Sequence, residues 1–195
     1  MRIIALTIAV VMFATGLALA VAPVTAETVM AAQDFGRERA DFPLAAFLQL
    51  WTVYEERAAR LDDTAERACL YTPFLLIAAD ARDRTAAGGA VAAGDADKVL
   101  SDYAGYVIFG VTLVGDRADF AGKYTASLRQ GRKYVRPSLV RAPPPPAADG
   151  SPPYRVQVYF YFPAQDVATD RSATLTVAAA DKRQRFFSVH FGELR

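Results

Sequence analysis

This chain of 195 residues is almost without histidine and cysteine: it contains one of each, His190 and Cys69. A structural zinc site ligated by cysteines needs several thiolates, and a disulfide within the chain needs two. Both are therefore excluded, as is any site that requires two histidines. We expect no metal ligands and no cofactor.

The chain also lacks an excess of charge of either sign. Lys and Arg number 22, Asp and Glu number 21, and the only charged residue before Glu27 is Arg2. Residues 27–195 are therefore neutral overall. Because non-specific binding to nucleic acid depends on a basic excess, nucleic acid is not expected as a partner.

Only one segment is long and apolar enough to cross a membrane, and it lies at the amino terminus. After Arg2, residues 3–22 are uncharged, and small residues occupy positions 24–26. This order predicts a secretory signal peptide over residues 1–26, cleaved before Glu27. An uncleaved anchor is the alternative, because about 20 apolar residues can span a hydrocarbon core. We expect an exported chain, in the periplasm, at the cell surface or outside the cell, with membrane contact only through an uncleaved signal segment.

The next periodic segment predicts an amphipathic helix over residues 42–61. Asp41 and Pro43 are typical of a helix start. Apolar residues then recur at steps of three and four, the spacing of one helix face: Leu44, Phe47, Leu48, Trp51, Tyr54, Ala58 and Leu61. This face requires a partner, and we expect it to lie on a sheet. Residues 27–40 show no period and are interpreted as a loose lead-in.

Beyond residue 63 most segments are short and have a period of two, which is typical of strands. About seven strands are expected, over residues 70–79, 106–114, 123–128, 133–140, 154–162, 173–177 and 186–191. A buried helical segment is the alternative for the first of them. Pro137 places its strand at an edge or a bulge. In the clearest strand, Val156, Val158, Phe160 and Phe162 form one face, which we assign to the core.

The connecting segments contain a short helix and two loops. Asp95 is expected to cap a helix that runs through Asp102. Residues 85–94 are small and flexible, and residues 142–153 hold six of the eleven prolines, which is typical of a stiff, polyproline-like connector.

Strands and helices do not alternate, so a parallel sheet is not expected. Repeated strands at hairpin-like spacing instead predict a mainly β protein with an immunoglobulin-like antiparallel β-sandwich. We expect this domain to cover residues 64–195, with the amino-terminal helix of residues 27–63 packed on it.

Residues 103–195 carry three motifs that support this fold. They are a long apolar strand (YVIFGVTLVGD), a strand–turn–strand segment (KYTASLRQGRKYVRP), and an aromatic strand ending in proline (VQVYFYFP) followed by a strand pair (ATLTV and FFSVHF). In this outline the segment resembles immunoglobulin-like domains of bacterial exported proteins of unknown function. The resemblance implies a fold and an envelope or secreted setting, and it implies no active-site residue.

The two rare residues offer little support for catalysis. His190 is expected on an outer strand face beside Ser188, and neighbours two apart on a strand do not aim at one substrate atom. Cys69 has no partner histidine in sequence, so we interpret it as a buried spare thiol, with pairing between two chains as the alternative. No catalytic residue is assigned.

Two acidic pairs occur in turns: Asp95 with Asp97, and Asp116 with Asp119. Two carboxylates in one loop are too few for a calcium site, and capping or turn formation explains them. A facing pair of carboxylates could also serve glycoside hydrolysis.

The best candidate for a binding surface is a set of aromatic and arginine side chains on outward strand faces: Arg155, Tyr159, Tyr161 and Phe186, beside Arg185. Tyrosine and arginine are the residue types enriched at interface hot spots. If a helix covers this face, the same residues form a second layer of core.

These observations together predict a non-enzymatic, exported binding or structural module of the bacterial cell envelope. Its partner would be an envelope protein or a glycan. The alternative is a secreted hydrolase or carbohydrate-active enzyme that uses an Asp/Glu pair.

Overall fold

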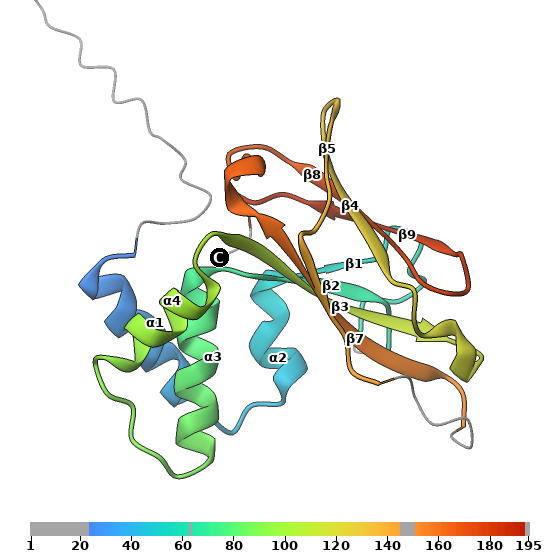
Figure 1. The fold of residues 1–195 in the computed structure, drawn as a ribbon. Helices are drawn as coiled ribbons and strands as arrows, with labels where there is room; N and C mark the ends of the chain where they lie inside the picture. The colour runs from blue at the N-terminus through green and yellow to red at the C-terminus, as the bar shows by residue number, and fades with distance from the viewer. Residues whose placement is uncertain (1–23, 63, 145–150, 194–195) are drawn as a thin grey trace, which may run out of the picture.

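The computed structural model describes residues 24–62, 64–144 and 151–193 as two antiparallel sheets and a layer of helices (Figure 1). Sheet A has the strand order β1 (Thr52–Tyr54), β2 (Arg67–Tyr71), β3 (Tyr106–Gly115), β7 (Tyr154–Pro163), β6 (Leu139–Arg141). Sheet B has the order β5 (Lys133–Val135), β4 (Thr125–Gln130), β8 (Ala173–Ala178), β9 (Gln184–Val189). The helices are α1 (Ala26–Glu38), α2 (Leu44–Leu48), α3 (Pro73–Ala86) and α4 (Asp95–Tyr103), with short 3-10 turns η1 (Gln49–Trp51), η2 (Ala118–Phe120) and η3 (Ala164–Asp166).

One face of sheet A packs on sheet B and forms an apolar core. The predicted inner face of β7 is there: Val156, Val158, Phe160 and Phe162 are all buried. Leu175 of β8 and Phe187 of β9 close this core from sheet B. The prediction of two packed antiparallel sheets is confirmed.

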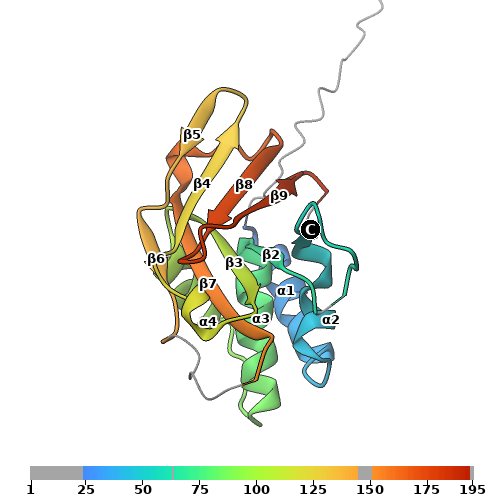
Figure 2. The same ribbon diagram turned by 90° about the vertical axis from the view of Figure 1, so that its right-hand side faces the viewer.

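The other face of sheet A is covered by the helical layer, as Figures 1 and 2 show from two sides. Trp51 and Phe47 are buried there against α3 and β2, so the expectation that an apolar helical face lies on a sheet is confirmed. Helices α1 and α3 approach closely through small residues. A Cβ on Gly36 would lie 2.1 Å from the Ala78 carbonyl oxygen, so only glycine allows this approach.

The proline in the predicted strand 133–140 divides it between the two sheets. β5 ends before Pro137 at the edge of sheet B, and β6 begins after it at the edge of sheet A. Both pieces are edge strands, as expected from a residue that cannot donate a ladder hydrogen bond. The short helix expected from Asp95 is also present as α4, although Gly94 is its N-cap.

The prediction of a mainly β protein is wrong, because helix and strand occupy comparable shares of the chain. Three sequence-based predictions of local structure are also wrong. Residues 27–40 are not a loose lead-in, because α1 spans Ala26–Glu38 and buries Ala32. The predicted helix 42–61 ends at η1, and residues 52–54 form β1, paired with β2. The sequence Thr-Val-Tyr suits a strand, and pairing with a neighbour overrides helical spacing.

The predicted strand 70–79 is two elements, β2 and α3. The Thr72 hydroxyl accepts a hydrogen bond from the Leu75 amide at 3.2 Å, and Pro73 occupies the first helical turn. A capping threonine followed by proline is a helix start.

The predicted signal peptide falls largely on residues 1–23, which lie outside the described residues. In the part of the chain that the structure does describe, none of the helices combines the length and the apolar character needed to cross a membrane.

Candidate functional site

The four residues of the predicted binding surface do not lie together. Tyr159 and Tyr161 of β7 point from sheet A toward the helical layer, where Tyr159 is half-buried and Tyr161 is 7% exposed. Arg155, on the same strand, is exposed at its other end. Phe186 belongs to sheet B, and its ring lies 5.8 Å from the Arg57 guanidinium carbon.

Tyr159 and Tyr161 line a pocket of about 650 Å³ between sheet A and the helices. Two more tyrosines join them, Tyr71 from β2 and Tyr103 from the end of α4, so we call this site the tyrosine pocket. The apolar part of its wall includes Phe47, Leu76 and Ile108, and its cations are Arg82 of α3 and Arg141 of β6. Helices therefore cover this face, as in the alternative that treats these tyrosines as a second layer of core. The helices nevertheless leave a pocket above the tyrosines.

A glycine in the central strand makes room for two of these rings. Tyr71 and Tyr159 lie on the strands either side of β3, with ring centroids 5.8 Å apart. A Cβ on Gly110 of β3 would lie 2.8 Å from Tyr71 Cε2 and 3.1 Å from Tyr159 Cε1. Any larger residue there would push the rings into the pocket.

Two of the four tyrosines, Tyr71 and Tyr161, have a raised pKa. Burial raises the pKa of Tyr71 far above its ordinary value, and the neighbouring Cys69 and Tyr159 add to the effect. Burial also raises the pKa of Tyr161, although Arg141 partly opposes it. These phenols are therefore hydrogen-bond donors at neutral pH.

Both arginines of the pocket stack over aromatic rings. The guanidinium carbon of Arg141 lies 5.5 Å from the centroid of Tyr161, and that of Arg82 lies 5.3 Å from Phe47. Arg82 Nη2 donates to the Phe42 carbonyl at 2.8 Å, and Nη1 donates to Asp83 at 2.8 Å. Its Nε is buried and has no hydrogen-bond partner among the residues that the structure describes.

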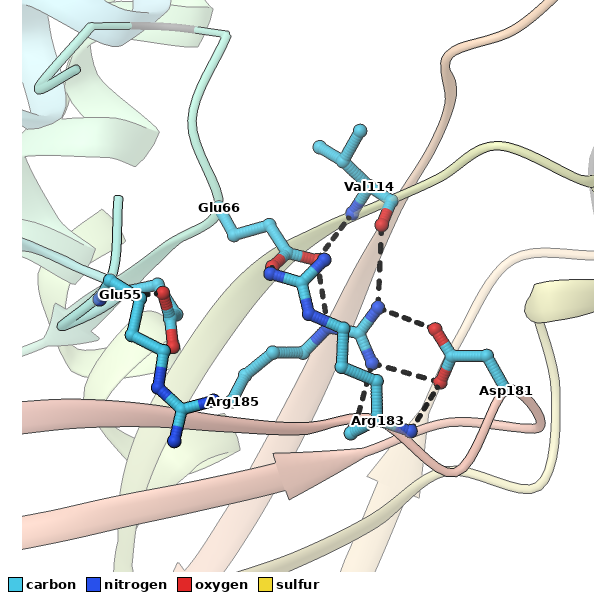
Figure 3. A network of polar contacts seen from close by, with 7 residues as sticks. Glu55, Glu66, Val114, Asp181, Arg183 and Arg185 are labelled. Atoms are coloured by element: carbon cyan, nitrogen blue, oxygen red, sulfur yellow. Dashed lines mark hydrogen bonds and ion pairs between the residues drawn. The ribbon is translucent and has the colours of Figure 1, made fainter. Parts of the chain in front are cut away.

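A second concave region has a volume of about 730 Å³, and we call it the charged cleft because acidic and basic side chains line it. They include Glu55, Glu66, Asp116, Asp119, Asp181, Arg57, Arg60, Arg117 and Arg183. Beneath it lies the network drawn in Figure 3, centred on the fully buried Arg185. Arg185 donates through Nε to Glu66 at 2.7 Å, and through both terminal nitrogens to Asp181 at 3.0 and 2.7 Å. The carbonyl oxygens of Arg183 and Val114 accept its two remaining N–H groups.

Arginine lowers the pKa of two carboxyls of this cleft. Hydrogen bonding to Arg185 lowers the pKa of Asp181, and hydrogen bonding to Arg117 lowers the pKa of Asp119. Glu66 accepts from Arg185, from the Val114 amide and from Arg183. A general acid in glycoside hydrolysis needs a raised pKa, which is the opposite direction.

The other acidic pair serves local structure. The Asp95 carboxylate accepts from the Ala92 amide at 2.8 Å and pairs with Arg84 at 3.3 Å. Asp97 is exposed in the first turn of α4. Among the described residues no cluster of three or more His, Cys, Asp and Glu side chains could hold a metal ion.

His190 is exposed, as expected, but its partner is not Ser188. Its Nδ1 lies 2.9 Å from the Ser172 hydroxyl, whereas the Ser188 hydroxyl donates to Glu56 at 2.6 Å. Both serines are exposed, and His190 lies outside the tyrosine pocket and the charged cleft. This surface pair has no substrate cavity around it.

Cys69 lies on β2 and is 4% exposed. Burial raises the pKa of its thiol to about 12, against smaller opposing effects of Thr52 and Arg67. The interpretation of Cys69 as a buried thiol is confirmed, and pairing between two chains stays an untested alternative.

The sequence identified two of the four tyrosines of the pocket. The alternation in β7 identified Tyr159 and Tyr161, but Tyr71, Arg82 and Tyr103 were missed. They converge only because β2, α3 and α4 surround the outer face of sheet A, and the start of α3 at Thr72 was the signal that could have placed them.

The chain matches no family model, no curated protein and no solved structure.

Proposed function

We propose that this chain is a non-enzymatic, exported binding module that holds a small organic ligand in the tyrosine pocket. One observation carries the proposal: four tyrosines from three elements gather around a single pocket of about 650 Å³. Ligand sites are concave, of about 300–1,000 Å³, and largely apolar with a few polar groups. The tyrosine pocket has these properties.

The sandwich beneath the pocket would act as a rigid support. Tyr159 and Tyr161 alternate along β7 with Val158, Phe160 and Phe162, which are fully buried. Their backbone positions are therefore fixed by the core on the other side of the same strand. We retain the immunoglobulin-like resemblance of residues 103–195 as part of this proposal, with an envelope protein or a glycan as the source of the ligand.

The charged cleft gives less support to the alternative, a secreted hydrolase. Its two carboxyls with shifted pKa values, Asp119 and Asp181, are both shifted downward by arginines. Glu66 is engaged by Arg183, Arg185 and a backbone amide, so it is not available to a substrate.

The proposal is tested by filling the pocket. Ala79 of α3 lines it and is half-buried, so Ala79→Leu would occupy the space that a ligand needs. Ala86→Leu is the matched control, because Ala86 is an exposed residue at the end of the same helix. The assay is a fragment screen by two-dimensional NMR on the protein without its first 26 residues.

We expect fragments to shift the resonances of Tyr103 and Tyr159, to lose affinity at least tenfold in Ala79→Leu, and to bind Ala86→Leu unchanged. Fragments that shift only residues of the charged cleft, or no fragment binding in this pocket, would overturn the proposal.

Export is supported by the signal-like pattern of residues 1–26, and α1 begins at Ala26 beside the expected cleavage point. Cleavage before Glu27 would remove Thr25, whose hydroxyl accepts from the Thr28 amide at 3.1 Å. Loss of such an N-cap costs roughly 1 kcal/mol. Intact mass of the secreted protein tests this: a membrane-bound product that still carries Met1 would favour the anchor.

A further inference from the structure

The proposed function leaves the ligand's chemistry open, and the pocket specifies it further. Building on that function, we infer that the ligand is an amphipathic organic anion, with an apolar ring or chain and one carboxylate or phosphate group. The inference depends on which charges line the pocket, on their unmet hydrogen bonds, and on the walls around them.

The charge balance of the pocket is positive. Arg82 and Arg141 are its two cations, and Asp83 is the one carboxylate among its described lining residues. Asp83 already accepts a hydrogen bond from Arg82, and its side chain is 73% exposed. Exposed pairs between such neighbours contribute little, so the carboxylate of Asp83 does not close the site to an anion.

Arg82 has an unmet donor. Its side chain is only 15% exposed, and among the described residues its Nε has no hydrogen-bond partner, while Nη1 and Nη2 each donate once. The buried Nε is closed to a ligand, but each terminal nitrogen carries a second N–H group. These two N–H groups lie in one plane and suit the oxygens of a carboxylate or phosphate.

Arg141 provides the second positive charge from the opposite wall element, the edge strand β6. Within the described part of the chain it forms no salt bridge, and its guanidinium lies over the ring of Tyr161. Arg141 also hydrogen-bonds the Tyr161 side chain, but a guanidinium has five N–H groups, so donors remain for an anion. Arg141 can therefore bind an anion without first leaving a protein carboxylate.

The remaining walls suit an apolar body. Phe47, Leu76 and Ile108 are apolar, and the rings of Tyr71 and Tyr159 add aromatic area. The phenols of Tyr71 and Tyr161 are neutral at neutral pH, and burial raises the pKa of both, so they carry no charge that would repel an anion. A cationic ligand would meet two arginines, and a neutral one would leave their charge uncompensated.

The test compares ligands of one shape and different charge. The probes are 1-naphthoate, 1-naphthylmethanol and 1-naphthylmethylamine, with octanoate and octanol as a second pair, titrated by calorimetry and NMR. We expect each anion to bind at least tenfold more tightly than its alcohol, and the amine to bind most weakly.

Two variants locate the effect. Arg141→Gln, at an exposed edge position, should remove most of the preference for the anion, and Arg82→Lys should weaken anion binding because lysine lacks the planar fork. Arg129→Gln is the control, because Arg129 is an exposed arginine on β4 of sheet B outside the pocket. It should leave both affinities unchanged.

Each other outcome overturns the inference. Equal binding of naphthoate and its alcohol, both lost in Ala79→Leu, would reject the anion and leave the proposed function standing. An anion preference that persists in Arg141→Gln and Arg82→Lys would reject the two arginines as its source. If neither anion binds while fragments still do, the ligand is of another class, and if nothing binds in the pocket, the proposed function fails as well.

Discussion

Two arginines are withdrawn from solvent in this fold, and they differ in how their donors are satisfied. Arg185 is fully buried, and the protein itself provides acceptors for all five of its N–H groups. The side chain of Arg82 is 15% exposed, one of its partners is the largely exposed Asp83, and its Nε has no partner in the described part of the chain. Arg185 joins β9 to β2 and β3, whereas Arg82 lies at the wall of a pocket.

The comparison distinguishes an arginine whose donors are used within the protein from an arginine that can bind a ligand. A network that is complete within the protein gains nothing from a ligand and loses stability when one member is removed. A donor left open beside a pocket costs the folded protein some stability, and a ligand can recover it. The tyrosine pocket is therefore the better candidate for function, although the charged cleft is slightly larger.

The largest effect expected is that of Arg185→Met. The substitution leaves Glu66 and Asp181 without their cation, and breaking a buried pair costs about 3–5 kcal/mol. Arg82→Met is the matched comparison and should cost about 1 kcal/mol, close to the value of one hydrogen bond. Urea unfolding measures both, and equal losses would contradict the distinction between the two arginines.

Trp51→Ala should cost roughly 3–5 kcal/mol, because Trp51 is fully buried between Phe47 and Phe74 behind the pocket wall. Trp51→Phe should cost much less, since the indole Nε1 has no hydrogen-bond partner to lose among the described residues. Thermal unfolding of the two variants measures the difference. A loss under about 1 kcal/mol for Trp51→Ala, the range of surface substitutions, would mean that the helical layer is loosely attached.

The Arg185 network should also make the free energy of unfolding depend on pH in acid. Hydrogen bonding to Arg185 lowers the pKa of Asp181 below its unfolded value of 3.8. The stabilisation is therefore complete above pH 3.8 and is lost as the pH falls through the lowered folded pKa. Asp181→Asn should cost about 1–2 kcal/mol at pH 7, and its difference from the parent protein should shrink below pH 3.8. A difference that is constant with pH would contradict this assignment.

The smallest expected effect is at Cys69, beside Tyr71. Because burial raises the thiol pKa to about 12, the native chain should not react with iodoacetamide at pH 8, and it should react fully in urea. Non-reducing electrophoresis should show no disulfide-linked dimer. A dimer formed by the native protein would revive the alternative of pairing between chains.

The strands with a strict period of two could be predicted from sequence, because each of their faces meets a layer of different chemistry. Val156 and Phe160 face the core between the sheets, while Tyr159 and Tyr161 face the helices. The alternation of residue types in β7 predicts these two faces. The same local signal also identified two residues of the candidate site.

The helical layer could be predicted only in part. The spacing of Phe47 and Trp51 revealed its apolar face, but the preference of residues 52–54 for strand pairing ended the helix early. Thr72 and Pro73 began a helix where the apolar run indicated a strand. The Arg185 network was not predictable, because Glu66 and Arg185 are 119 residues apart and nothing local links them.

That separation has a consequence for how the chain acquires its structure. A polypeptide that emerges amino end first presents β3 without β7, its partner over ten aligned residues, until residue 163 has emerged. The charge of Glu66 can be paired and buried only after Arg185, close to the carboxyl end, has emerged. Folds dominated by such distant pairings form slowly. Almost the whole chain must therefore be present before the sandwich can close.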